Sequence, residues 1–128
     1  MIDILIIEDD DVTNFISQTK LNSLGIQNIS IVTNGQMGID YLKSNHCPDL
    51  ILLDINMPIL DGWEFLETKN SLGLCPDIPI IITTSSGRPE DRSKASAFND
   101  ICKYLEKPVN YDDLQLLFLN LKQKKIEL

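Results

Sequence analysis

The sequence has few of the residues that define several large protein classes. Only one histidine and three cysteines occur among 128 residues. Cys47, Cys75 and Cys102 are an odd number and lie far apart, so we expect neither a disulfide framework nor a cysteine-rich zinc site. His46 lacks a second histidine and falls in an expected turn, which favours a surface position. These features predict a reduced, cytoplasmic protein in which Cys102 is a small buried side chain.

Long hydrophobic runs and positive charge are also scarce. No segment approaches the roughly 20 consecutive apolar residues of a membrane span. The amino-terminal run Met1–Ile7 has no basic flank and leads into acids, which is unlike a signal peptide. Lys and Arg number 11 against 19 Asp and Glu, a net charge of −8. Such a charge disfavours binding to nucleic acid or to an anionic membrane surface. No glycine-rich phosphate loop is present, so nucleotide binding is not indicated.

The remaining composition is that of one globular domain. Hydrophobic residues make up 43% and charged residues 23% of the chain. No linker, repeat or low-complexity tract divides it, so we expect a single domain over residues 1–128 with no output domain. A fragment of a longer protein is the alternative.

Short apolar runs alternate with segments of helical length. The predicted strands are Ile2–Ile7, Ile29–Val32, Leu50–Leu53, Ile80–Ile82 and Ile101–Leu105. The predicted helices are Val12–Leu24, Gly35–Lys43, Gly62–Leu72, Pro89–Phe98 and Tyr111–Lys124. Near-continuous Ile and Leu indicates strands buried on both faces. The alternation therefore predicts an α/β fold, a doubly wound five-stranded parallel sheet with five helices on its two faces.

Polar side chains follow the predicted strands where each strand ends. Glu8 to Asp11 follow the first strand, Asp54 the third, Thr83 to Ser86 the fourth and Lys107 the fifth. In parallel sheets the carboxyl ends of the strands meet at one edge, where ligands bind. Clustered carboxylates need a compensating cation, and Mg²⁺ prefers such oxygen ligands. A carboxylate can be the nucleophile toward phosphorus, and a metal with a lysine neutralises phosphoryl charge. This set indicates phosphoryl transfer.

In four places the sequence resembles the receiver domains of two-component response regulators. The resemblance covers about residues 3–123 and rests on motifs that occur in order at the strand ends. They are Glu8-Asp9, Pro48–Gly62 around Asp54, Pro79–Ser85, and Tyr104-Leu105-Glu106-Lys107-Pro108. It implies the flavodoxin-like strand order 2-1-3-4-5.

The resemblance also implies a role for each matching residue. Asp54 is then the phosphoacceptor, and a phosphohistidine of a histidine kinase or His-containing phosphotransfer protein is the donor. Lys107 pairs with Asp54 before transfer and with the phosphoryl group after it. The Lys107–Pro108 peptide bond is expected to be cis. Thr84 binds a phosphoryl oxygen, and Tyr104 moves with it. The implied Mg²⁺ ligands are Glu8, Asp9, Asp54 and the backbone carbonyl of Asn56.

Three departures from the family pattern affect these assignments. Glu8 replaces the usual Asp, and its longer side chain favours metal contact through water. Thr83 precedes Thr84, but alternation along a strand places the two on opposite faces, and spacing favours Thr84. Asp100-Ile101 stands where the family has Gly-Ala, which leaves the geometry of that loop open.

The predicted function is a stand-alone receiver that signals through a conformational change and is no turnover enzyme. The alternatives are a Mg²⁺-dependent aspartyl-phosphate phosphohydrolase, a phosphate relay or sink, and a flavodoxin-like binding module without chemistry. The fourth helix has few large apolar residues, which predicts low stability and a switching role. Tyr104 could instead be an ordinary half-buried strand residue. For Leu116 and Leu119 of the last helix we expect a wide buried face rather than a partner surface.

Overall fold

The computed structural model describes residues 2–127, with side chains described for residues 2–120. Within these residues, five strands alternate with five helices. The strands are β1 (Asp3–Ile7), β2 (Asn28–Val32), β3 (Leu50–Leu53), β4 (Ile80–Thr84) and β5 (Ile101–Glu106). The helices are α1 (Asp11–Ser23), α2 (Gly35–Ser44), α3 (Gly62–Ser71), α4 (Pro89–Ala95) and α5 (Tyr111–Glu127). All strand pairs are parallel in the order β2-β1-β3-β4-β5, which confirms the predicted doubly wound sheet.

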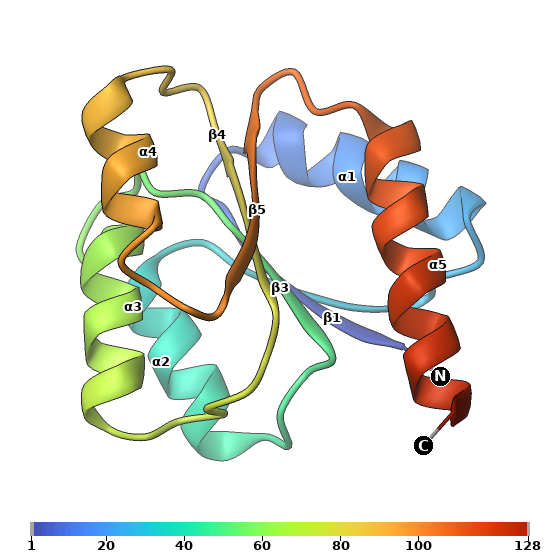
Figure 1. Cartoon of the computed structure of the whole chain (residues 1–128), viewed down its shortest axis with the longest axis horizontal. Helices are drawn as coiled ribbons and strands as arrows, with labels where there is room; N and C mark the ends of the chain where they lie inside the picture. The colour runs from blue at the N-terminus through green and yellow to red at the C-terminus, as the bar shows by residue number, and fades with distance from the viewer. Residues whose placement is uncertain (1, 128) are drawn as a thin grey trace.

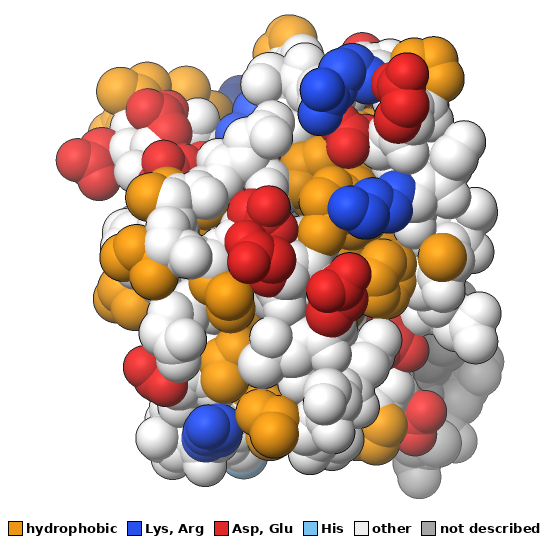
Figure 2. Space-filling view, turned by 90° about the vertical axis from the view of Figure 1, so that its left-hand side faces the viewer, with side chains coloured by type: hydrophobic (Ala, Val, Ile, Leu, Met, Phe, Trp, Pro, Cys, Tyr) orange, Lys and Arg blue, Asp and Glu red, His pale blue; other side chains and the backbone are white. Residues whose placement is uncertain are grey.

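Helices cover both faces of the sheet. Helices α1 and α5 lie on one face, and α2, α3 and α4 lie on the other (Figure 1). Alternate residues of β1 supply the two cores: Leu5 and Ile7 pack toward Phe65 of α3, and Ile4 and Ile6 pack toward α1 and α5. The central strands are therefore buried on both sides, which explains their unbroken Ile and Leu runs. Outside the core, the α2–α4 side of the molecule presents acidic, basic and hydrophobic side chains interspersed (Figure 2).

Local sequence signals fix most helix ends. Gly25 and Gly73, which follow α1 and α3, have positive φ angles of 87° and 66°, as expected of glycines that terminate helices. The side chain of Asn110 accepts hydrogen bonds from the backbone N–H groups of Asp112 and Asp113, so it caps the start of α5. Helix α4 ends at Ala95, three residues before its predicted end.

Two expectations about cysteine are wrong. Cys47 and Cys75 form a disulfide across 28 residues of sequence. Cys47 follows α2 and Cys75 follows α3, and both connections return the chain to the starts of the neighbouring strands β3 and β4. The topology thus brings the two side chains together, which sequence spacing does not reveal. Cys102 is exposed rather than buried.

The expected wide buried face of α5 is also wrong. Leu114 and Phe118 pack into the core, but Leu116 and Leu119 are 63% and 54% exposed. One face of α5 meets the sheet, and these two leucines lie off that face. The side chains of residues 121–127, which include Leu121 and three lysines, lie outside the described part of α5. Within residues 2–127, none of the helices combines the length and apolarity needed to cross a bilayer.

Candidate functional site

The predicted site residues converge at the carboxyl end of the sheet. Glu8 and Asp9 directly follow β1, and Asp54 directly follows β3, its neighbour in the sheet. Thr84 is the last residue of β4, and Lys107 directly follows β5. Adjacent parallel strands therefore deliver acids, a hydroxyl and a lysine to one place, as the sequence predicted.

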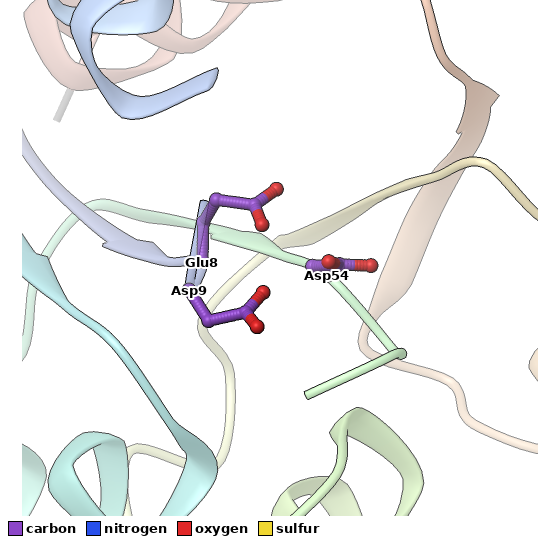
Figure 3. A group of neighbouring side chains, drawn as sticks. All are labelled: Glu8, Asp9 and Asp54. Carbon is purple, nitrogen blue, oxygen red and sulfur yellow. The ribbon is translucent and has the colours of Figure 1, made fainter. Parts of the chain in front are cut away.

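Three carboxylates form the centre of the site. Glu8, Asp9 and Asp54 each place an oxygen within 4.8 Å of the others. Figure 3 shows Glu8 and Asp9 at the end of β1, with their carboxylates turned toward the side on which Asp54 lies. Glu8 and Asp54 are 2% and 4% exposed, whereas Asp9 is open to solvent. This oxygen-only set, reached from one exposed side, fits a hard divalent cation such as Mg²⁺.

Lys107 supplies the positive charge that these acids need. Its Nζ donates a hydrogen bond to Glu8 Oε1 and lies 3.5 Å from Asp54 Oδ2. Burial lowers the pKa of Lys107, but the hydrogen bond to Glu8 and the charge of Asp54 outweigh it and raise that pKa overall. Burial raises the pKa of Glu8 to about 7 and repulsion from Asp54 adds to this, while the bond from Lys107 opposes it. The Lys107–Pro108 peptide bond is cis, as expected.

Thr84 is the hydroxyl of the site. Its side chain is fully buried, and its Oγ1 accepts hydrogen bonds from Asn56 Nδ2 and from the Ser86 backbone N–H, both at 3.2 Å. The Asn56 backbone N–H donates to Asp54 Oδ1 at 3.1 Å. Asn56 therefore contacts both the Thr84 hydroxyl and the Asp54 carboxylate. Thr83 lines a small cavity on the α1–α5 side instead. Thr84 is thus joined to Asp54 through Asn56, whereas Thr83 shares the small cavity with Glu8 and has no such link to Asp54 among the described contacts.

Tyr104 connects the site to α4. Its hydroxyl donates to the Ser86 backbone carbonyl at 3.0 Å, two residues beyond Thr84. The Arg92 guanidinium lies 4.7 Å from the centre of the Tyr104 ring and also pairs with Glu106 at 2.6 Å. Burial raises the pKa of the Tyr104 hydroxyl. The half-buried ring is therefore held between the β4–α4 loop and the first turns of α4.

Sequence reasoning missed two buried charges, Asp91 beside the site and Lys69 toward the opposite end of the sheet. Asp91 of α4 is 6% exposed and accepts hydrogen bonds from Ser86 Oγ at 2.5 Å and from Arg88. The bond from Ser86 lowers the pKa of Asp91. Lys69 of α3 is fully buried and pairs with Asp100 at 3.0 Å. The Arg88-x-x-Asp91 spacing is a usable local signal for the first pair, whereas Lys69 and Asp100 are distant in sequence and meet only through the fold.

Comparison with known proteins identifies the chain. Residues 4–118 match the response regulator receiver domain family. The chain belongs to the response-regulator receiver family. The receiver is 35% identical to a probable transcriptional regulator, ycf29, of Porphyra purpurea, over 92% of this chain and 55% of that protein. It is 32% identical to two-component response regulator 24 of Arabidopsis thaliana, over 86% of this chain and 76% of that protein. The receiver thus spans about half of the first relative and three quarters of the second.

Solved structures agree with this assignment. A two-component response regulator from Legionella pneumophila superimposes with a TM-score of 0.84 at 29% identity, covering 96% of the receiver and 99% of that chain. The receiver domain of a sensor histidine kinase from Pseudomonas aeruginosa superimposes with a TM-score of 0.79 at 26% identity, covering 94% of each chain. That structure contains a magnesium ion coordinated in its active site cleft. The receiver is thus the phosphoryl-accepting module of two-component signalling.

Proposed function

We propose that Asp54 is the phosphoacceptor of this receiver. The observation that carries the proposal is the placement of Asp54 between Glu8, Asp9 and Lys107, with Thr84 joined to it through Asn56. Among these acids Asp54 stands at the tip of a central strand, where a donor can approach from the open side next to Asp9.

The residues of the site have distinct tasks in the transfer. An Asp54 carboxylate oxygen attacks phosphorus in line, the phosphorus–nitrogen bond of the donor histidine breaks, and the electron pair returns to its imidazole. Lys107 turns from Glu8 and Asp54 toward the phosphoryl oxygens, and the Thr84 hydroxyl rotates to donate to one of them. Bound Mg²⁺, held by Glu8, Asp9, Asp54 and the Asn56 backbone carbonyl, would add positive charge opposite the phosphoryl oxygens. Glu8 either contacts the metal directly or does so through water.

A histidine kinase or His-containing phosphotransfer protein is the proposed donor. Next to the acids, Val12, Phe15 and Ile16 of α1 are 66%, 71% and 44% exposed. They lie directly after the acidic run, on the helix that begins at the site. Large apolar side chains on such a surface favour a protein donor over a small molecule alone. Histidine kinases take the phosphoryl group from ATP, which is a cytoplasmic substrate, so we place the receiver in the cytoplasm.

The proposed output is a conformational change in α4 and β5. Movement of Thr84 toward a phosphoryl group would break its bond from the Ser86 N–H and shift the loop whose carbonyl holds Tyr104. The receiver would catalyse only its own phosphorylation and dephosphorylation, as a stand-alone signalling protein or as a phosphate relay or sink.

Acetyl phosphate labelling tests the assignment. We expect the wild-type receiver to gain the mass of one phosphoryl group with Mg²⁺ and to remain unmodified with a chelator. Asp54→Asn should not be labelled, and Asp9→Asn should be labelled slowly. Labelling of Asp54→Asn would remove the central assignment. Sustained turnover of phosphate esters by the wild type would favour a phosphohydrolase, although Asn56 stands where such an enzyme needs a second acid.

A further inference from the structure

The Cys47–Cys75 disulfide lies at the end of the sheet opposite the acidic site. Cys47 precedes β3 and Cys75 precedes β4, whereas the acids follow the strands. The bridge takes no part in the phosphoryl chemistry described above. Its surroundings nevertheless differ from those of a buried structural disulfide.

The two sulfur-bearing residues are unequally accessible. Cys47 is exposed, whereas Cys75 is only 9% exposed. An open groove of about 420 Å³ runs beside the bridge, and both cysteines line it together with Pro48, Asp49, Pro76 and Asp77. Thiol–disulfide exchange requires an incoming thiolate to reach one sulfur of the bridge. The groove therefore offers a small thiol access at Cys47 in the folded protein.

The backbone on each side of the bridge is held independently of the sulfur–sulfur bond. Each bridged cysteine is followed by a proline, Pro48 is buried, and Cys75 adopts a positive φ of 45°. The Asp49 N–H donates to the Asp3 carbonyl at 2.8 Å, and the Ile51 N–H donates to the Pro79 carbonyl at 3.1 Å, which joins the segments that follow the two cysteines. These contacts keep the two cysteines near each other after the bridge opens, which favours its closing again.

We propose that Cys47 is a reversible thiolation site that takes a low-molecular-weight thiol of the glutathione class. A thiolate attacks Cys47 Sγ, the bond to Cys75 breaks, and Cys75 Sγ leaves with the electron pair and takes a proton from water. A second thiolate attacks the outer sulfur of the adduct, which releases the Cys47 thiolate and one small-molecule disulfide. Two small thiols are thereby oxidised and the bridge is reduced. The same steps in reverse, with the small-molecule disulfide as oxidant, restore the bridge.

The cytoplasmic placement proposed above gives the site its significance. Disulfides in reducing compartments are commonly transient or redox-sensing rather than permanent. The bridge ties the connection after α2 to the connection after α3, so its opening would remove one covalent link between them while leaving the acids in place. The exchange itself depends only on the access to Cys47.

Mass spectrometry of the full receiver in a Cys102→Ser background tests the site, because Cys102 is the other exposed cysteine. Native protein is incubated with millimolar reduced glutathione, quenched in acid and mapped by peptide. We expect an intermediate with one glutathione on Cys47 and a free thiol at Cys75, formed without denaturant. In a second arm, oxidised glutathione is added to Cys75→Ser and to Cys47→Ser. We expect the adduct on Cys47 to form roughly tenfold faster than the adduct on Cys75.

Two results would overturn the proposal. One is a wild-type bridge that resists glutathione until urea unfolds the chain, which would make it a structural disulfide. The other is an intermediate that carries glutathione on Cys75. Circular dichroism confirms that each variant is folded, and the first arm needs no variant of the bridge. No phosphoryl donor is used, so failure here leaves the role of Asp54 untouched, and the reverse also holds.

Discussion

At the scale of single residues, the half-buried Lys107 is the side chain on which the acidic site depends. Lys107 faces Glu8 and Asp54, both nearly inaccessible to water. Lys107→Ala should lower the free energy of unfolding by about 1–3 kcal/mol, because it leaves two buried carboxylates without their cation. Urea denaturation at neutral pH without Mg²⁺ measures this change.

A second substitution supplies the control for this prediction. Glu8→Gln in the Lys107→Ala background removes one of the two uncompensated charges. We expect it to recover part of the lost stability, so the two changes should be non-additive. Strictly additive effects would show that Lys107 acts through packing and not through its charge.

The two adjacent threonines should behave differently. Thr84 meets Asn56 at the site, whereas Thr83 lines the cavity between the sheet, α1 and α5. Thr84→Ala should slow labelling by acetyl phosphate roughly tenfold or more, because a preorganised donor to the phosphoryl group is lost. Thr84→Ser should restore most of the rate. Thr83→Ala is the matched control, and an equal loss of rate there would contradict the assignment.

At the scale of elements, α4 is the least anchored helix. It has seven residues, no side-chain hydrogen bond at its start, and only Asp91 and Ala95 buried. Helix α3 buries Trp63, Phe65 and Leu66 and begins with a capping box at Asp61. In hydrogen–deuterium exchange, amides of α4 should exchange at least roughly tenfold faster than those of α3. Equal protection of the two helices would contradict the switching role of α4.

The start of α3 should tolerate no side chain at Gly62. A Cβ at this position would lie 2.6 Å from the Ile55 Cα and 2.8 Å from the Asp54 carbonyl oxygen, both backbone atoms that cannot rotate away. Gly62→Ala should therefore cost about 1–3 kcal/mol of stability and disturb the loop after Asp54. Gly25→Ala is a useful comparison, since its cost of about 1–2 kcal/mol arises from a positive φ angle and not from crowding. Thermal unfolding ranks the two variants.

The positions of helices and strands were predictable because local sequence determines them. Which side of a helix is buried was less predictable, because tertiary contacts determine it. Continuous apolar runs and the segments of helical length between them placed the strands and helices, except for the last three residues predicted for α4. Helix faces were harder, because α1 buries Asn14 and Ser17 while leaving Phe15 exposed. Asn14 Nδ2 donates to the Glu8 backbone carbonyl, so a tertiary contact outweighs hydrophobicity there.

At the scale of the whole molecule, the candidate site was predictable because parallel topology fixes where strands end. Once Glu8, Asp54, Thr84 and Lys107 were assigned to strand ends, the sheet alone brought them together. The opposite end of the sheet offered no such signal. The loops before β3 and β4 have no shared chemical motif, so the meeting of Cys47 and Cys75 depends on the lengths of α2 and α3 and on how they pack.

The same disulfide should determine much of the stability of the receiver. It closes a loop between residues 28 apart, for which the chain-entropy model gives a stabilisation of about 3–4 kcal/mol. Domains of this size are stable by only about 5–15 kcal/mol in total. Urea denaturation of oxidised Cys102→Ser should therefore show a clearly higher midpoint than the same protein after reduction, or than Cys47→Ser/Cys75→Ser/Cys102→Ser. Because the acidic site lies at the other end of the sheet, all three should still be labelled by acetyl phosphate at 25 °C. Equal midpoints would contradict this prediction. They would mean that the bridge raises the free energy of the folded state as much as it raises that of the unfolded chain.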